Sequence, residues 1–162
     1  MILFKKVAGL QQYLTRLKQK GHTIGFAPTM GALHEGHLSL IESSRKANAI
    51  TVSSIFVNPA QFNDPKDFEK YPVTIEKDIL MLETAGCSVL FLPSVEEIYP
   101  AGSPAKEYYD LGYLETILEG KYRPGHFQGV CKVMDRLLDI VRPGNLYLVI
   151  YTWARRTISN VW

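Results

Sequence analysis

The chain has 162 residues, about the length of one domain with a hydrophobic core, and a formal net charge of +2. Charged residues of both signs are mixed, and no basic cluster is interleaved with aromatic residues, so we expect no nucleic-acid partner. No apolar run is long enough to span a membrane, and the N-terminus lacks the apolar core of a signal peptide, so we expect a cytoplasmic protein with no membrane partner. Cys87 and Cys131 lie in apolar surroundings and are expected to be core thiols without a disulfide.

Helical and strand patterns alternate along the first half of the chain. The expected helices and strands, in chain order, are a helix over 5–20, a strand over 23–28, a helix to about 47, a strand over 50–57, a helix over 74–85 and a strand over 89–92. Gly21 would end the helix over 5–20. Thr74 is the expected N-cap of the helix over 74–85, and Gly86 would end it. This alternation predicts a right-handed parallel α/β sheet with flanking helices, and such sheets bind ligands at the carboxyl ends of their strands.

The second half shows weaker patterns. We expect a long loop over 94–110 with a short strand near Tyr108, a helix over 111–119, and a turn over 120–127. A clear apolar stripe then predicts a helix over 128–141, followed by a strand that begins at Asn145 and continues to Val149.

The most informative segment is the turn after the strand at 23–28, with the sequence Pro-Thr-Met-Gly-Ala-Leu-His-Glu-Gly-His over 28–37. It leads into a helix, whose unpaired N–H groups favour anions such as phosphate. His34 and His37 are three residues apart, so both can lie on one face of the first helical turn. An imidazole there can donate a hydrogen bond to a phosphate oxygen as its charge grows, which predicts a nucleotide site for chemistry at phosphate.

Two other interpretations of the histidines remain open from this segment alone. They could be ordinary surface residues beside a turn. They could also bind a metal, although the spacing His-Glu-Gly-His differs from the His-Glu-x-x-His spacing that places two ligands one helical turn apart.

Further motifs follow at set intervals. They are Asn-Pro-Ala-Gln-Phe over 58–62, Tyr-Pro-x-Thr over 71–74, Phe-x-Pro-Ser-x-x-x-x-Tyr-Pro over 91–100, and Arg-Pro-Gly-His-Phe over 123–127. Together with the turn over 28–37, they resemble the pantothenate synthetases, which are ATP-dependent pantoate–β-alanine ligases. The resemblance implies a Rossmann-like parallel sheet of the nucleotidyltransferase superfamily, His-x-Gly-His type, with residues 1–148 as its ATP- and pantoate-binding domain.

The resemblance also implies a two-step reaction. The carboxylate of pantoate attacks the α-phosphate of ATP, which gives a pantoyl adenylate and pyrophosphate. The amine of β-alanine then attacks the acyl adenylate and releases pantothenate and AMP. Mg²⁺ accompanies the ATP, and the family forms homodimers. No protein nucleophile is needed, so positioning and charge stabilisation would carry the chemistry.

The same resemblance assigns roles to individual residues. The catalytic pair is His34 and His37, and the expected ATP contacts are Pro28, Met30, Gly31, His34 and His37. The expected pantoate contacts are Asn58, Gln61 and Phe62, the supporting residues are Tyr71, Arg123 and His126, and the residue associated with the metal is Asp78. Taken singly, Gln61 could be an ordinary loop amide, and Asp78 an acid favoured by the helix dipole.

The resemblance ends at Leu148, where the family continues with a Lys-Asp-Tyr-Gln-Gln segment. Codons for Lys-Asp-Tyr-Gln-Gln-Cys-Met, read one base later, encode Arg-Thr-Ile-Ser-Asn-Val-Trp, which is the sequence of residues 156–162. We therefore expect residues 149–162 to be an aberrant, frameshift-derived tail and the C-terminal lid domain of the family to be absent.

Three functions compete on this basis. The first is the pantoate–β-alanine ligase. The second is a nucleotidyltransferase of the same superfamily that acts on a phosphate ester, for which Lys or Arg would suit the place of Gln61 better. The third is an inactive ATP-binding fragment.

Overall fold

The computed structural model describes residues 1–62, 68–101 and 108–148. Within them, five strands form one parallel sheet in the order β1-β4-β3-β2-β5. The strands are β1 (Ile2–Phe4), β2 (Ile24–Thr29), β3 (Ile50–Ile55), β4 (Val89–Phe91) and β5 (Asn145–Leu146). The predicted parallel α/β architecture is therefore confirmed.

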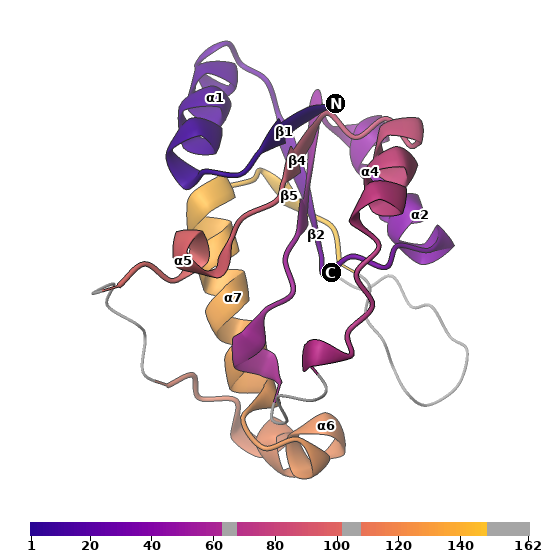
Figure 1. Ribbon diagram of the computed structural model, residues 1–162. Coiled ribbons are helices and arrows are strands. Elements are labelled where there is room, and N and C mark those ends of the chain that lie inside the picture. Colours follow the sequence, from indigo (N-terminus) through magenta and orange to yellow (C-terminus); the bar gives the residue numbers. More distant parts are fainter. Residues whose placement is uncertain (63–67, 102–107, 149–162) are drawn as a thin grey trace.

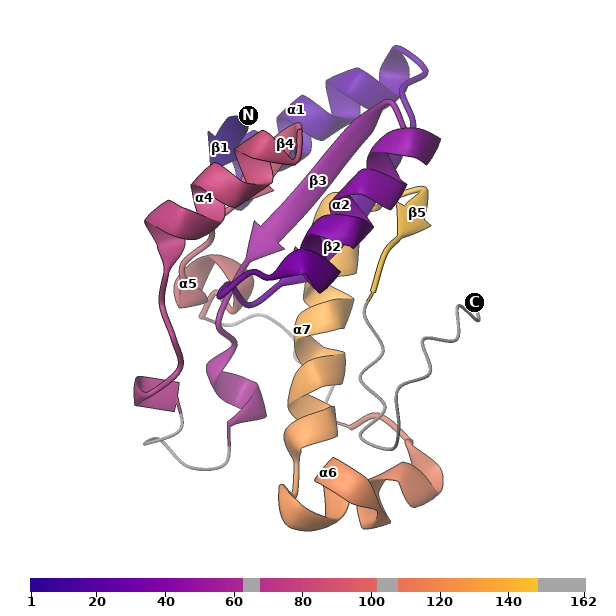
Figure 2. The same cartoon turned by 90° about the vertical axis from the view of Figure 1, so that its right-hand side faces the viewer.

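Helices cover both faces of the sheet (Figure 1). One face carries α1 (Val7–Gln19) and α7 (His126–Val141), and the other carries α2 (Glu35–Ala47) and α4 (Ile75–Thr84). Figure 2 shows α2 running alongside β3 and β2, with α7 on the far side of the sheet. No helix among the described residues is both long and apolar enough to cross a lipid bilayer.

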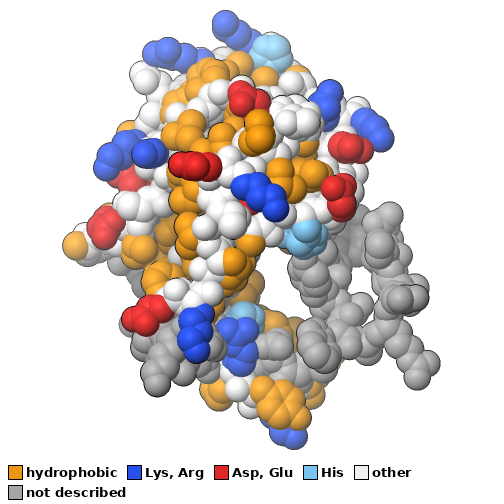
Figure 3. Space-filling model, turned by 45° about the vertical axis from the view of Figure 1, so that its right-hand side comes forward, with side chains coloured by type: hydrophobic (Ala, Val, Ile, Leu, Met, Phe, Trp, Pro, Cys, Tyr) orange, Lys and Arg blue, Asp and Glu red, His pale blue; other side chains and the backbone are white. Residues whose placement is uncertain are grey.

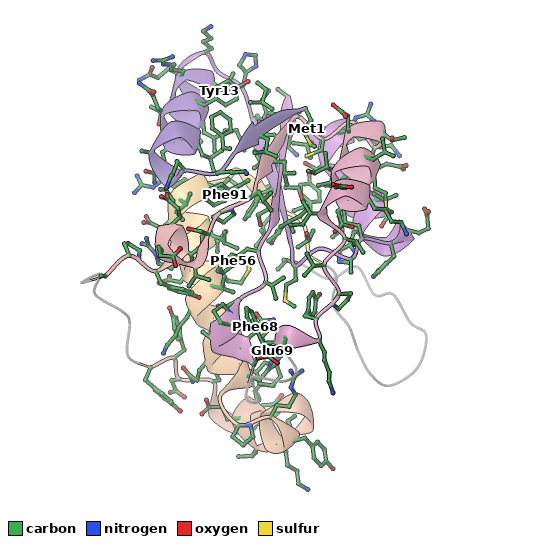
Figure 4. All side chains as sticks on the ribbon, in the orientation of Figure 1. Met1, Tyr13, Phe56, Phe68, Glu69 and Phe91 are labelled. Atoms are coloured by element: carbon green, nitrogen blue, oxygen red, sulfur yellow. The ribbon has the colours of Figure 1, made fainter. Side chains whose placement is uncertain are left out.

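Each face of the sheet has its own hydrophobic cluster. On the α1/α7 side, Phe26, Val52 and Phe91 are fully buried. Figure 4 shows Phe91 and Phe56 on this side, with Tyr13 reaching toward it from α1. On the α2/α4 side, Ile41 and Leu82 are fully buried. The strands are buried on both faces, as parallel sheets usually are.

Four further short elements lie among the described residues. They are the 3₁₀ helix η1 (Pro59–Gln61), α5 (Val95–Ile98), the 3₁₀ helix η2 (Gly112–Thr116) and α6 (Leu118–Tyr122). On the face drawn in Figure 3, acidic and basic side chains are interspersed over the described surface.

Several predictions from the sequence need correction. No strand forms at Tyr108 or in the described residues beside it, and the helix expected over 111–119 is divided between η2 and α6. α6 also takes the first residues of the turn expected over 120–127, and α7 begins two residues early, at His126. Strand β1 and helix α5 were missed. The expectations for residues 149–162, including the end of the last strand at Val149, lie outside the described residues.

Thr74 and the two cysteines differ in part from what was expected. Thr74 takes the N-cap position of α4, but its side chain makes no capping hydrogen bond. Cys87 is buried as expected, and Cys131 is only half-buried, at the edge of the stripe of α7. Both thiols are free.

Strand β2 lies where the chain changes direction across the sheet. Its neighbour on one side is β3, reached through α2, and its neighbour on the other is β5, which follows α7. Because α2 and α7 cover opposite faces, the carboxyl end of β2 opens between them (Figure 1). Ligands of open α/β sheets bind at such a switch point.

Candidate functional site

The turn after β2 is held by side chains within and beneath it. The hydroxyl of Thr29 donates to the carbonyl of Ser54 at 2.8 Å and accepts the N–H of Gly31 at 3.2 Å. Gly31 has φ +88°, a conformation that glycine adopts without strain, and Ala32 follows at φ +50°. These bonds fold the chain sharply away from the sheet before α2 begins.

Asp78 of α4 clamps the same turn from the other side. Its carboxylate is fully buried and accepts the N–H groups of Ala32 at 3.0 Å and Leu33 at 2.8 Å, together with the hydroxyl of Thr74 at 3.0 Å. No group of three His, Cys, Asp or Glu side chains placed to hold a metal exists in the described part of the chain. The carboxylate oxygens of Asp78 are engaged in shaping the turn, and its expected association with a metal stays a prediction.

His34 and His37 lie at the start of α2, as predicted, with ring centroids 4.2 Å apart. His34 is the N-cap, and its Nδ1 accepts the N–H of Gly36 at 3.1 Å. Nδ1 of His37 accepts the N–H of His34 at 3.4 Å, a long contact. An Nδ1 that accepts must carry no proton, so each neutral ring holds its proton on Nε2. The N-cap geometry thus fixes the tautomer of each neutral ring.

The pKa of His37 is lowered, mainly because half-burial disfavours the charged imidazolium and secondarily because His34 is adjacent. Asp78 opposes this shift. The His37 imidazole is therefore mostly neutral at neutral pH.

A pocket of about 550 Å³ opens at this point. One wall is the turn after β2, with Pro28, Met30 and Gly31, and the rim carries both histidines. The opposite wall is the apolar stripe of α7, which contributes Val130, Val133, Met134 and Leu137. Gln61 and Tyr71 also line it, so the structure brings the expected ATP residues and Gln61 to one cavity.

Gln61 lies at the end of η1 and is 8% exposed. Its Nε2 points at the thioether of Met30, 2.6 Å away, and its Oε1 accepts from Nδ2 of Asn58 at 3.3 Å. Asn58 is fully buried and does not line the pocket. In this structure Asn58 therefore supports Gln61, and its expected contact with pantoate stays a prediction.

The N-terminal part of α7 packs directly onto η1. A Cβ placed at Gly129 would lie 2.6 Å from Cα of Gln61 and would also clash with the carbonyl of Ala60. The carbonyl of Gly129 accepts from Nδ2 of Asn58 at 3.0 Å. His126 contacts the same segment, with its Nδ1 3.0 Å from the carbonyl of Gln61. His126 thus supports Gln61 through the backbone.

The remaining predicted residues lie at or behind the rim of the pocket. Phe62 packs edge-on against Phe68 and Tyr71, with centroid distances of 5.5 and 5.8 Å, and does not itself line the pocket. Tyr71 does line it. Arg123 precedes α7, where its carbonyl accepts the N–H of His126 at 3.0 Å, and the structure does not place it in the pocket wall.

A second pocket of about 430 Å³ lies on the other side of Met30. It is bounded by the end of β3, the start of α4 and the segment from Leu92 to Glu96. Met30, Gly31 and Phe56 border both pockets.

Sequence reasoning missed three residues that shape the site, namely Thr29, Tyr99 and Gly129. Thr29 and Tyr99 stood inside motifs singled out from the sequence, but which atoms they contact depends on long-range folding. Gly129 carried a weaker signal, because a glycine inside an otherwise well-patterned helix often marks a close backbone approach.

Comparison with known proteins agrees with this arrangement. The family model described as pantoate-beta-alanine ligase matches residues 2–149. The pantothenate synthetase of Cytophaga hutchinsonii is 48% identical over 147 residues, which are 91% of this chain and 51% of that protein. That of Aquifex aeolicus is 46% identical over 146 residues, which are 90% of this chain and 51% of that protein.

Two solved structures are also similar. The pantoate-beta-alanine ligase of Francisella tularensis, complexed with beta-gamma ATP and beta-alanine, superposes with a TM-score of 0.83 at 44% identity, over 90% of this chain and 55% of that one. The pantothenate synthetase of Thermus thermophilus gives a TM-score of 0.80 at 43% identity, over 90% of this chain and 51% of that one.

A Rossmann-like parallel sheet with a His-x-Gly-His helix start at the switch point defines a domain of the nucleotidyltransferase superfamily. Within that class, the chain belongs to the pantoate-beta-alanine ligase family. It spans about half the length of the curated relatives that it matches.

Proposed function

We propose that residues 1–148 form the ATP- and pantoate-binding domain of a ligase that condenses pantoate with β-alanine. The observation that carries this proposal is that His34, His37 and Gln61 line one cavity at the carboxyl end of β2. The two histidines proposed to bind phosphate and the Gln61 amide proposed to bind pantoate therefore face the same cavity. The transfer of an adenylyl group to a carboxylate requires such an arrangement, because both substrates must meet. The named relatives support the same activity.

In this proposal, the carboxylate of pantoate attacks the α-phosphate of ATP, and pyrophosphate leaves. The Nε2–H groups of His34 and His37 donate to phosphate oxygens, where negative charge grows during the attack. The amine of β-alanine then attacks the carbonyl of the acyl adenylate, and AMP leaves with the electrons of the C–O bond. The chain supplies positioning and hydrogen bonds, and no side chain forms a covalent bond.

Gln61 favours this ligase over a transferase that acts on a phosphate ester. A neutral amide suits the hydroxyl and carboxylate oxygens of pantoate, whereas a phosphate ester would favour a cation there. The apolar wall from α7 suits the carbon skeleton of a small hydroxy acid. As further parts of the proposal, Mg²⁺ arrives with the ATP, and the protein works in the cytoplasm as a homodimer without a nucleic-acid or membrane partner.

Calorimetry on this chain tests the assignment, with ATP–Mg²⁺ and pantoate titrated separately. Replacing both histidines, His34→Ala with His37→Ala, should weaken ATP binding by roughly a hundredfold or more, since two hydrogen bonds to charged groups contribute about 1.5–3 kcal/mol each. Pantoate affinity should stay within about twofold. His22→Ala is the matched control, because His22 is exposed and distant from the pocket lining. Undiminished ATP binding in the double variant would refute the site.

The activity itself is tested by following AMP release. Release should require ATP, pantoate and β-alanine together in the full-length enzyme of the family that carries this domain. AMP release that needs a phosphate ester in place of pantoate would instead identify the transferase.

A further inference from the structure

A buried chain of side-chain hydrogen bonds runs from α5 to the pocket. The hydroxyl of Tyr99 donates to Oδ1 of Asn58 at 2.9 Å. Nδ2 of Asn58 donates to Oε1 of Gln61 at 3.3 Å, and Nε2 of Gln61 points at the sulfur of Met30. Tyr99 lies outside the pocket lining and its ring packs against Phe56, 6.3 Å between centroids.

The orientation of both amides follows from their partners. Oδ1 of Asn58 also accepts the N–H of Ala60 at 3.2 Å, and Nδ2 also donates to the carbonyl of Gly129 at 3.0 Å. If the Asn58 amide were flipped, its NH₂ group would face the N–H of Ala60 and its oxygen would face the carbonyl of Gly129. Both contacts would then be repulsive. With Asn58 fixed, Oε1 of Gln61 must face it, so Gln61 presents its N–H edge to the cavity.

The hydroxyl of Tyr99 is the side-chain anchor of this arrangement. Burial raises the pKa of Tyr99 to about 12, so the hydroxyl keeps its proton and remains a donor. Its removal would leave Oδ1 of Asn58, a buried acceptor, with a single partner and a freer amide plane.

The thioether of Met30 is a weak acceptor for the N–H of Gln61. A carboxylate or hydroxyl oxygen of a ligand would be a stronger acceptor at the same place. Binding is therefore favoured when the N–H of Gln61 donates to such an oxygen instead of to the sulfur of Met30.

We propose that Tyr99 is a positioning residue. Through Asn58, it holds the Gln61 amide with its N–H edge toward the pocket, and this edge selects a ligand that offers a hydrogen-bond acceptor. Identifying that acceptor as a pantoate oxygen rests on the proposed function, whereas the orientation of the amide does not.

The first measurement needs no ligand. In ¹⁵N-labelled chain, the side-chain NH₂ resonances of Gln61 are assigned from their loss in Gln61→Ala. Tyr99→Phe should shift these resonances. Tyr147→Phe is the matched control, because it also removes a hydroxyl bonded to an asparagine amide, that of Asn48 at 2.8 Å, on the opposite face of the sheet. It should leave the Gln61 resonances in place.

The second measurement is affinity. Tyr99→Phe should weaken pantoate binding about three- to tenfold while ATP binding changes less than twofold, as loss of one hydrogen bond predicts. In a Gln61→Ala background, the same substitution should add less than a twofold loss, because its effect passes through Gln61. Gln61→Glu should weaken pantoate binding more than Gln61→Ala, since a carboxylate oxygen of the glutamate would then face the acceptor oxygen of pantoate.

The outcomes separate the two proposals. An unchanged Gln61 resonance in Tyr99→Phe, or a full additional loss in the Gln61→Ala background, would overturn the positioning role. If Tyr99→Phe fails to fold, intact pantoate affinity in Gln61→Glu would overturn the selection of an acceptor. A wild-type chain that binds ATP but no pantoate would count against the proposed substrate, and the amide resonances would still decide the orientation.

Discussion

The carboxylate of Asp78 accepts the backbone N–H of Leu33 at 2.8 Å, across 45 residues of sequence. This bond ties the first half of α4 to the turn that leads into His34. The conformation of the turn between β2 and α2 is therefore set from α4 as well as from β2.

Loss of this clamp should destabilise the fold and the site together. Asp78→Ala leaves the N–H groups of Ala32 and Leu33 without their acceptor, which should lower the free energy of unfolding by roughly 2–4 kcal/mol. Urea denaturation measures the loss, and calorimetry should show weaker ATP binding. Glu76→Ala is the control, because Glu76 occupies the same first turn of α4 but is exposed. Equal stability of the two variants would contradict the clamp.

Gly129 should not tolerate a side chain. Gly129→Ala would force α7 away from η1, at a cost of about 1–3 kcal/mol in unfolding free energy, although alanine ordinarily favours a helix. The matched variant is Gly9→Ala in α1, where an added Cβ meets Phe4 at an ordinary 3.5 Å. That variant should be more stable by roughly 0.5–1 kcal/mol. Thermal unfolding of both variants therefore tests the contact, because the same substitution should lower stability at Gly129 and raise it at Gly9.

Protonation of His37 should oppose folding. Its pKa in the folded chain lies below the usual 6.5, so the unfolded chain binds the proton more tightly. The free energy of unfolding should fall as the pH drops below about 6.5, and this contribution should level off below the lowered pKa. Comparing urea denaturation of wild type and His37→Gln between about pH 5 and pH 8 isolates the effect. Parallel pH profiles would show that His37 does not contribute.

The two thiols should differ in reactivity. Burial raises the pKa of Cys87 to about 11, so only about one part in a thousand is thiolate at pH 8. Cys131 is only half-buried, and burial raises the pKa of its thiol as well. A disulfide reagent should therefore modify one thiol quickly in the folded chain and the second only on unfolding. The fast phase should vanish in Cys131→Ser, and a fast phase that persists there would show that Cys87 is accessible.

The sequence predicted the central part of the fold because its signals there are local. Each of β2, β3 and β4 is an apolar run ended by a turn or by proline. Strand β1 was missed, because three residues form it solely by pairing with β4, more than 80 residues away. The strand expected near Tyr108 was wrong for the converse reason, since none of the described strands pairs with the β-prone residues there.

The site was predicted in the same uneven way. The turn over 28–37 and Gln61 carry their chemistry in local motifs, and the structure brings them to one pocket. The positions of Asn58 and Asp78 depend on partners far along the chain. Both are polar groups with no exposure, and their hydrogen bonds hold the residues that line the pocket. Sequence motifs alone do not separate a residue that touches a ligand from one that supports it.

Met30 stands between the two pockets as a common partition. Its side chain is unbranched and turns about three bonds, so it can lean to either side at little cost. Space gained on one side is taken from the other. A group that fills the second pocket and displaces Met30 would consequently narrow the pocket rimmed by the histidines. The shape of each pocket therefore depends on what fills the other.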